Sequence, residues 1–179
     1  GFVASTGMWD GQVEAFKGHY RLIRWDMRGH GRTECPDDQA AYGQDITVAD
    51  MVAILDHLEI NNAIIVGHSL GGFMSLRLNV IHPERVSALV LQGCGPGYRS
   101  DDSRAKWNKR VDGRAQTILE EGYQALGGAA EVPVSVQRSS QELAMAARGI
   151  LAQVAATVIN SLPHIDVPTL VIIGKGDSY

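Results

Sequence analysis

The chain has 179 residues, which suffice for one domain with a hydrophobic core, and 45% of them are hydrophobic while 20% are charged. A formal net charge of −4 argues against a nucleic-acid or anionic-membrane partner, because such partners require a basic surface. The two cysteines, Cys35 and Cys94, are too few for a disulfide framework, so we expect reduced thiols and a cytoplasmic location. No apolar stretch approaches the roughly 20 residues of a membrane span, and the first residue is Gly, so a leader preceding it would not be seen.

The first quarter of the chain contains candidates for two helices and one strand. Apolar residues at helical spacing predict a short helix within 9–16. Residues 20–27 are a strand candidate that ends in a glycine-rich loop. Thr47 is expected to cap a second helix whose apolar face runs from Val48 to Leu58.

Two continuous apolar runs, 62–67 and 86–93, are typical of strands that are buried on both faces of a parallel sheet. Between them, residues 70–81 predict a helix that stops before Pro83. A strand, a helix and a strand of these lengths imply parallel pairing with a right-handed crossover. The sequence therefore predicts the α/β class.

The second half of the chain is mostly helical until its last strand. Charged residues 100–126 and apolar-periodic residues 141–162 predict helices on either side of a loop, and residues 169–173 predict a last buried strand. Because about 70 residues interrupt the strand–helix alternation, we expect them to form a cap over one edge of the sheet. We divide the chain into residues 1–97 as the first part of the core, 98–162 as the cap insertion, and 163–179 as the last core strand with its turn.

One turn carries a chemical signature. Gly67-His68-Ser69-Leu70-Gly71 fits the pattern G-x-S-x-G between a predicted strand and a predicted helix. A sharp strand-to-helix turn strains the backbone of its central residue, and we expect Gly67 and Gly71 because side chains there would be too crowded. Such a turn presents the Ser69 hydroxyl at a helix N-terminus, where developing negative charge is stabilised. The alternative is a turn in which Ser69 only caps the helix.

Several segments together resemble the α/β-hydrolase superfamily. "GHSLGG" resembles its nucleophile turn, "DMRGHGRT" its glycine loop, "VPTLVIIGKGD" its acid-bearing strand, and "GFVASTGMWDGQVEAF" its oxyanion segment. The resemblance implies a mostly parallel sheet with helices on both faces and a helical cap. It also implies a fold that is incomplete at both ends, because the segment with the family's catalytic His would follow Tyr179. Residues 104–122 are loosely similar to enol-lactonase-like esterases.

The resemblance assigns roles to individual residues. It implies Ser69 as the nucleophile, Asp177 as the acid of the triad, and the backbone N–H groups of Phe2 and Leu70 as the oxyanion hole. No metal and no organic cofactor is implied. The candidate residues of the pocket are His68, His30, Cys94 and Trp107, although for His30 we favour a loop-stabilising hydrogen bond and for Trp107 ordinary helix packing.

Two acidic residues keep alternative interpretations. Asp177 lies in "GKGD", which is also an ordinary turn sequence. Asp26 is either a second carboxylate of the site or a partner for Arg28 or for the amides of the glycine loop, and we favour the partner.

We expect a serine hydrolase that cleaves a small carboxylic ester, lactone or related acyl compound, with its catalytic His beyond this chain and the fragment alone inactive. Ser69 argues against epoxide hydrolases and haloalkane dehalogenases, whose nucleophile is Asp. Cofactor-free haloperoxidases, C–C bond hydrolases and hydroxynitrile lyases share the triad and stay open. The alternative from another class is a non-catalytic ligand-binding protein on the same scaffold. The oligomeric state is not indicated by the sequence.

Overall fold

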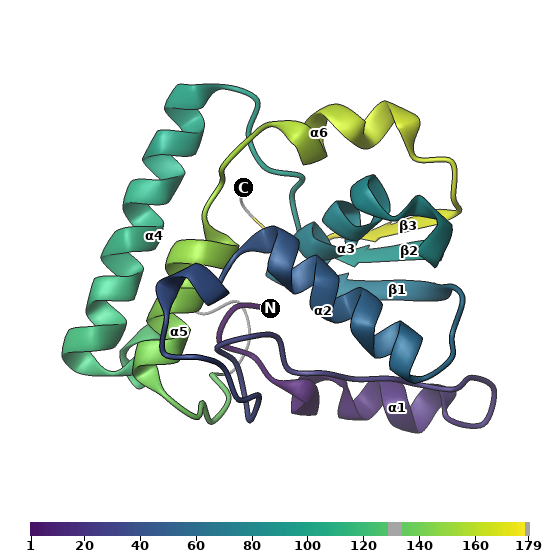
Figure 1. Cartoon of the computed structure of the whole chain (residues 1–179), viewed down its shortest axis with the longest axis horizontal. Coiled ribbons are helices and arrows are strands. Elements are labelled where there is room, and N and C mark those ends of the chain that lie inside the picture. The colour runs from purple at the N-terminus through teal and green to yellow at the C-terminus, as the bar shows by residue number, and fades with distance from the viewer. Residues whose placement is uncertain (129–133, 178–179) are drawn as a thin grey trace.

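The computed structural model describes residues 1–128 and 134–177, which contain a sheet of three parallel strands (Figure 1). The strands lie in the order β1 (Ala63–His68), β2 (Val86–Gln92) and β3 (Thr169–Ile172). Helix α3 (Leu70–Ile81) joins β1 to β2 and packs against both strands. The α/β class and the predicted strand–helix–strand unit are therefore confirmed.

The other helices surround this unit. Figure 1 shows α4 and α5 side by side, beyond the end of the sheet at which the strands finish. None of the helices in the described part of the chain combines the length and the apolar character that crossing a bilayer requires. The remaining α-helices are α1 (Asp10–Phe16), α2 (Gln44–His57), α4 (Asp101–Glu121), α5 (Ser140–Ala146) and α6 (Thr157–Ser161). Short 3₁₀-helices cover Thr6–Trp9, Gln39–Ala41, Pro83–Arg85, Tyr123–Gly128 and Leu162–His164, and a π-helix covers Ala147–Leu151.

Two predicted elements differ from the structure because of hydrogen bonding. Residues 20–27 form no strand, since no described segment provides them with a backbone ladder. Helix α2 begins at Gln44 rather than after Thr47, and the Thr47 hydroxyl donates to the Gly43 carbonyl (2.9 Å) from inside the helix. The predicted cap at Thr47 is therefore wrong.

The predicted helix over 141–162 is also divided. Helix α5 continues into the π-helix, residues 152–156 are non-helical, and α6 follows. Where the helical hydrogen bonds end, the Gln44 side chain provides the donor: its Nε2 donates to the carbonyls of Ile150 (3.2 Å) and Ala152 (2.5 Å). These bonds satisfy carbonyls that a helix end leaves without partners. Of the predicted loop over 127–140, residues 134–139 are non-helical, 127 and 128 belong to the 3₁₀-helix Tyr123–Gly128, Ser140 begins α5, and 129–133 lie outside the described residues.

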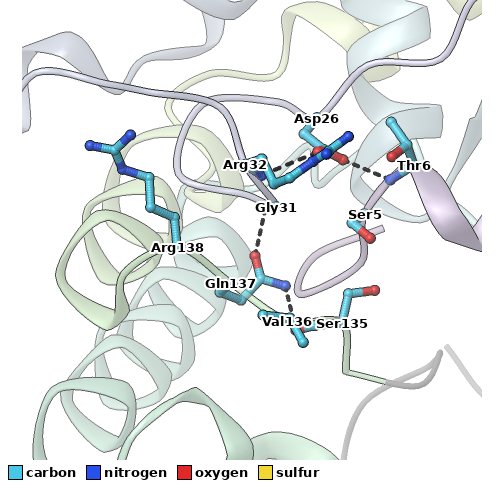
Figure 2. A pocket seen from close by; sticks show the side chains of 9 residues that line it. All are labelled: Ser5, Thr6, Asp26, Gly31, Arg32, Ser135, Val136, Gln137 and Arg138. Carbon is cyan, nitrogen blue, oxygen red and sulfur yellow. Dashed lines mark hydrogen bonds between the residues drawn. The ribbon is translucent and has the colours of Figure 1, made fainter.

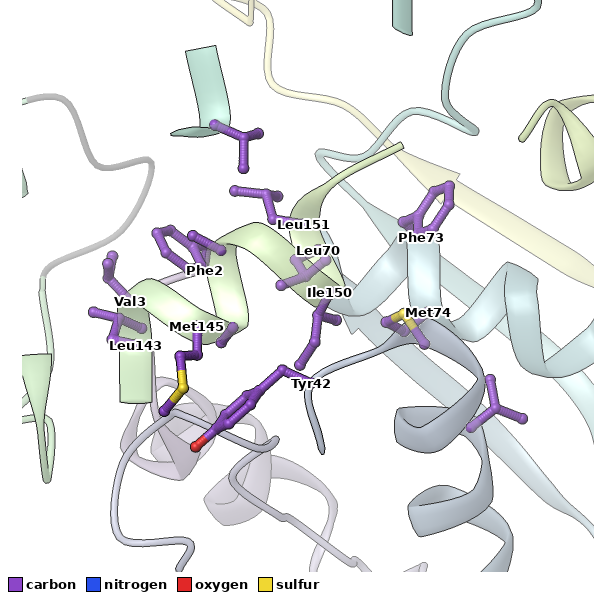
Figure 3. Close-up of a cluster of buried hydrophobic side chains, with 14 of the residues drawn as sticks. Phe2, Val3, Tyr42, Leu70, Phe73, Met74, Leu143, Met145, Ile150 and Leu151 are labelled. Atoms are coloured by element: carbon purple, nitrogen blue, oxygen red, sulfur yellow. The ribbon is translucent and has the colours of Figure 1, made fainter. Parts of the chain in front are cut away.

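The core lies between α3 and the helices beyond the sheet's end. Met74 and Leu78 of α3 are fully buried, and α5 and the π-helix contribute Leu143 and Ile150 to the same cluster (Figure 3). Figure 3 also places Phe2 and Leu70 in this core. The N-terminal turn and the start of α3 are thus held by one apolar cluster, which positions the residues discussed below.

The strands are not buried on both faces as predicted. Ile64 and Val66 of β1 are 48% and 49% exposed, and every residue of β3 is exposed. Among the helices in the described part, α3 is the one with extensive contacts to the strands, so it covers one face of the sheet. Strand β3 is exposed because it lies at the edge of the described sheet.

Candidate active site

Ser69 has a strained backbone. Its φ of 50° and ψ of −116° fall outside the regions that a residue with a side chain adopts readily. Although Ser69 occupies the N-cap position of α3, its hydroxyl makes no capping hydrogen bond. Ser100 and Ser139, in contrast, cap α4 and α5 through their side-chain oxygens. Helix capping therefore does not account for Ser69.

The neighbouring glycines show where this turn is crowded. A Cβ on Gly67 would lie 2.3 Å from the backbone carbonyl of Gly71, and one on Gly72 would lie 2.4 Å from the Sγ of Cys94. A Cβ on Gly71 itself would meet nothing within 4 Å. The expectation of crowding is confirmed at Gly67 and wrong at Gly71, while Gly72 is the second position that requires glycine. Cys94 is partly buried and packs against the first turn of α3.

These distances give a prediction for stability. Gly67→Ala is expected to lower the free energy of unfolding by about 3 kcal/mol or more, because its Cβ would collide with backbone atoms that cannot move independently. Gly71→Ala is the matched control, with an expected change of less than about 1 kcal/mol or a slight stabilisation, since alanine favours helix. Urea unfolding followed by circular dichroism measures both, and equal destabilisation by the two variants would contradict the prediction.

The N-terminal turn lies beside Ser69. A Cβ on Gly1 would come within 2.8 Å of His68 Nδ1 and 3.6 Å of Ser69 Cβ, so Gly1 is in close contact with the strand end that carries Ser69. The turn closes through a hydrogen bond from the Ala4 amide to the Gly1 carbonyl (3.2 Å). The Phe2 N–H belongs to the peptide bond with Gly1, and Gly1 lies beside Ser69. Leu70 is the first residue of α3, where helical geometry provides no acceptor for its N–H.

Ser69 follows the carboxyl end of β1 and Asp177 follows the carboxyl end of β3, so both residues lie at the same end of the parallel strands. The register aligns His68 with Gln92 and Gln92 with Ile172, so all three strands end side by side. The exposed carboxylate of Asp177 accepts a hydrogen bond from the Gly174 amide (2.8 Å), which belongs to its own turn. The sheet thus brings both residues to its carboxyl end, where the Asp177 carboxylate is hydrogen-bonded within its own turn.

The chain is similar in sequence and fold to known proteins. A model of the α/β-hydrolase fold family matches residues 1–131, well over half of the chain. The chain belongs to the α/β-hydrolase fold family. This α/β hydrolase is 31% identical, over 99% of its length and 71% of the relative's, to a Bacillus subtilis (strain 168) protein provisionally named 2-succinyl-6-hydroxy-2,4-cyclohexadiene-1-carboxylate synthase.

Two further relatives, from different species, are named as enol-lactonases. The α/β hydrolase is 30% identical to 3-oxoadipate enol-lactonase 2 of Acinetobacter baylyi, over 97% of this chain and 67% of the relative. The crystal structure of the enol-lactonase from Burkholderia xenovorans LB400 superposes with a TM-score of 0.78 at 26% identity, over 98% of this chain and 70% of that chain. These matches place the whole of the described chain within one family fold.

His30 is buried in the glycine loop of the α/β hydrolase. Its Nδ1 lies 3.0 Å from the Arg28 carbonyl, so this nitrogen carries the proton, and its ring meets the Phe2 ring edge-on at a centroid distance of 5.4 Å. Among the described residues, Nε2 has no hydrogen-bond partner. Burial lowers the pKa of His30 from 6.5 to about 4, against the opposing effect of the Arg28 carbonyl. His30 is therefore neutral at pH 7. Its ring packs against the ring of Phe2.

This pKa predicts a dependence of stability on pH. The unfolded chain binds the His30 proton below pH 6.5 and the folded chain binds it only near pH 4, so acid favours unfolding. We expect the contribution of His30 to unfolding free energy to fall by about 3 kcal/mol between pH 6.5 and pH 4. His30→Phe should flatten the stability curve in this window. Urea titrations from pH 4 to pH 7 measure the slopes, and parallel curves for His30→Phe and wild type would contradict the assignment.

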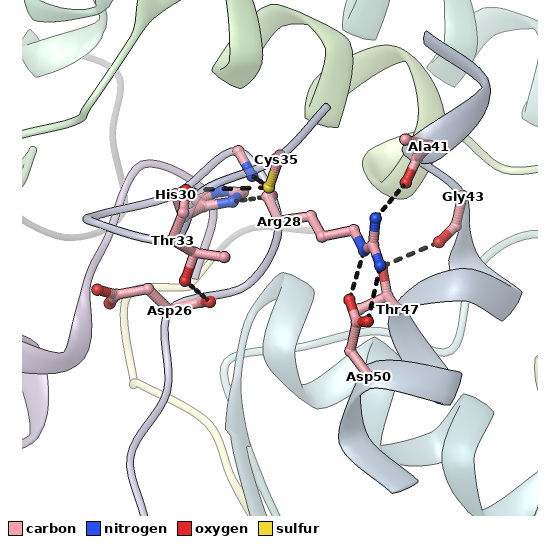
Figure 4. A network of polar contacts seen from close by, with 10 residues as sticks. Asp26, Arg28, His30, Thr33, Cys35, Ala41, Gly43, Thr47 and Asp50 are labelled. Carbon is pink, nitrogen blue, oxygen red and sulfur yellow. Dashed lines mark hydrogen bonds and ion pairs between the residues drawn. The ribbon is translucent and has the colours of Figure 1, made fainter. Parts of the chain in front are cut away.

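Asp26 of the glycine loop and Asp50 of α2 both have structural partners, and Figure 4 shows the pairing of Asp50 with Arg28. Asp26 accepts hydrogen bonds from the amides of Thr6 (2.6 Å) and Arg32 (3.2 Å). Arg28 pairs with Asp50 instead, through two bonds of 2.5 and 2.8 Å. The expected bond from Asp26 to a glycine-loop amide is thus confirmed, and the suggested pairing of Asp26 with Arg28 is wrong because Asp50 on α2 takes that guanidinium.

Trp107 on α4 is fixed by a polar contact of its own. Its indole N–H donates to the Leu151 carbonyl (2.9 Å), and Asn108 beside it bonds both the N–H and the carbonyl of Gln153 (2.7 and 2.9 Å). With Gln44 of α2, these side chains hold the end of the π-helix from two sides. Sequence reasoning missed Gln44 and Asn108, because polar residues on periodic helices give no signal of distant backbone partners.

Proposed function

We propose that the natural protein containing this chain is a serine hydrolase that cleaves a small carboxylic ester or lactone. The carrying observation is the strained Ser69 backbone, whose hydroxyl does not cap the helix that it precedes. Strain of this kind persists where function requires it. The enol-lactonases among the relatives support a lactone or ester as the substrate class.

The proposed mechanism assigns one role to each residue. Ser69 Oγ attacks the carbonyl carbon while a histidine outside residues 1–179 takes the Ser69 proton and gives it to the leaving alkoxide as the ester bond breaks. Water, deprotonated by the same histidine, then hydrolyses the acyl-serine and restores the Ser69 hydroxyl. Asp177 orients this histidine and stabilises its charged form. The N–H groups of Phe2 and Leu70 hold the oxyanion, where one donor contributes about 2.7–4 kcal/mol to lowering the barrier.

The histidines of the chain itself do not suit the role of base. His30 is buried, has its tautomer fixed by a carbonyl, and has a pKa lowered to about 4. His68 ends β1 directly before Ser69, and we expect the side chains of adjacent residues in such a turn to point apart. His82 follows α3 at the end opposite Ser69 and lies 3.2 Å from Glu84. His164 precedes β3, at the sheet edge opposite Ser69. His19 and His57 are exposed, and His57 ends α2 ahead of the amino end of β1, whereas Ser69 follows the carboxyl end of that strand.

The test combines labelling with turnover. We expect a fluorophosphonate probe to modify the natural protein at Ser69, as located by peptide mass spectrometry, and a panel of p-nitrophenyl esters and lactones to be hydrolysed. Labelling without turnover of any panel member would favour the triad-sharing lyases and C–C hydrolases over an esterase. The absence of both would contradict the enzyme and favour a ligand-binding protein on this scaffold.

A further inference from the structure

Gln137 connects the N-terminal turn and the glycine loop to its own loop, and Figure 2 shows its contacts with Gly31 and with the chain at Ser135. Its Oε1 accepts a hydrogen bond from the Gly31 amide (2.8 Å), and its Nε2 donates to the carbonyls of Val3 (2.7 Å) and Ser135 (2.9 Å). The residue is 5% exposed, and both polar atoms of its amide are engaged. Gln137 is therefore buried and fixed by three hydrogen bonds, although it lies in a loop.

Val3 is the strained member of this arrangement. Its φ of 63° lies in the left-handed region, where a β-branched residue is a genuine outlier. Its carbonyl accepts two hydrogen bonds, from the Ser135 amide (3.0 Å) and from Gln137 Nε2 (2.7 Å). Such strain costs on the order of 1–3 kcal/mol and persists only where surrounding contacts enforce it. The contacts from Ser135 and Gln137 supply this enforcement.

The strained residue adjoins the proposed oxyanion donor. Phe2 and Val3 are the two central residues of the Gly1–Ala4 turn, and Gly1 touches the end of the strand that bears Ser69. Rotation of the Val3 backbone out of the left-handed region would reorient the turn and move the Phe2 N–H with it. Gln137 is placed to prevent that rotation, because it ties the Val3 carbonyl to the glycine loop at Gly31.

We propose that Gln137 is a positioning residue for the oxyanion hole, acting through the strained Val3 to hold the Phe2 N–H toward Ser69. This inference rests on the proposed function. It makes catalysis depend on the segment that leads into α5, which carries no group of the proposed mechanism. The same bonds connect the α4–α5 side of the molecule to the edge of the sheet at which the strands end.

The test replaces the amide by a group whose donor depends on pH. In Gln137→Glu, a protonated carboxyl still accepts from Gly31 and donates to Val3, whereas an ionised one faces two carbonyls without a proton to share. We expect kcat relative to wild type to fall about tenfold or more at pH 8 and to recover severalfold at pH 5.5, with KM changed less than about threefold, because losing an oxyanion donor costs 10²–10³ in kcat. Comparing the two enzymes at each pH cancels the titration of the catalytic histidine.

Gln44→Glu is the matched control, since Gln44 is also buried and also donates to two backbone carbonyls, those of Ile150 and Ala152, away from the Gly1–Ala4 turn. We expect its kcat ratio to stay flat with pH. Circular dichroism confirms that each variant is folded under assay conditions. If Gln137→Glu folds poorly, Gln137→Ala is used in its place and is expected to lose kcat at all pH values. If wild type is labelled at Ser69 and neither Gln137 variant loses kcat, or if Gln44→Glu shows the same pH-dependent ratio, the inference fails alone. If wild type is not labelled, the proposed function fails instead.

Discussion

Ser69→Ala is expected to lower kcat for ester or lactone hydrolysis by at least about 10⁴-fold and to abolish labelling by a fluorophosphonate. The substitution removes the atom that forms the covalent intermediate, and loss of the nucleophile in a comparable triad costs about 10⁶ in kcat. The variant should remain folded, because the Ser69 hydroxyl makes no capping bond that alanine would lose. Steady-state kinetics and intact-mass labelling of wild type and variant measure the effect.

The control is Ser75, a serine within the helix that Ser69 precedes. Ser75 is buried on α3, and its hydroxyl donates to the Gly71 carbonyl (2.8 Å). Ser75→Ala should keep labelling at Ser69 and lose less than about tenfold in kcat, while its free energy of unfolding falls by about 1 kcal/mol. Residual turnover of Ser69→Ala near that of Ser75→Ala would show that another group performs the chemistry.

The parts of the fold that sequence predicts well depend on local pattern. The apolar runs of β1 and β2, with α3 between them, specify strands and a crossover without knowledge of the rest of the chain. Residues 20–27 show the limit of this reasoning, since a strand also needs a partner to hydrogen-bond with. Strand β3 shows another limit, because an apolar run predicts burial only if something covers it, and β3 lies at an exposed edge.

The residues of the candidate site also differ in whether the sequence reveals them. Ser69 is recognisable because the crowding of its turn requires glycine at Gly67, which leaves a mark in the sequence. Gln137 leaves none, since a single glutamine in a loop has no periodicity and its contact with Val3 spans 134 residues. The strain at Val3 also leaves no mark in the sequence, because valine disfavours the left-handed conformation and so does not predict it. Groups that act by holding others therefore become visible only in three dimensions.

Asp177→Asn is expected to lower kcat by about 10³–10⁴-fold and to change KM less than about threefold. The negative charge of Asp177 is proposed to orient the catalytic histidine and to stabilise it when protonated, and loss of that charge in a comparable triad costs about 10⁴ in kcat. Asparagine keeps an oxygen that can accept from the Gly174 amide, as Asp177 Oδ2 does at 2.8 Å. The turn after β3 should therefore survive, and the loss of kcat would report charge rather than local unfolding.

Asp166→Asn is the matched control, because Asp166 is an exposed carboxylate just before β3, at the opposite end of that strand. Its kcat should lie within about twofold of wild type. Labelling of Ser69 separates the two halves of the proposal: Asp177→Asn should be labelled more slowly but still at Ser69, since the nucleophile is intact. A kcat equal to that of Asp166→Asn would assign Asp177 to its turn alone. The acid would then have to come from another residue at the carboxyl edge, and Asp101 and Asp102, which follow β2 at the start of α4, would be the next to substitute.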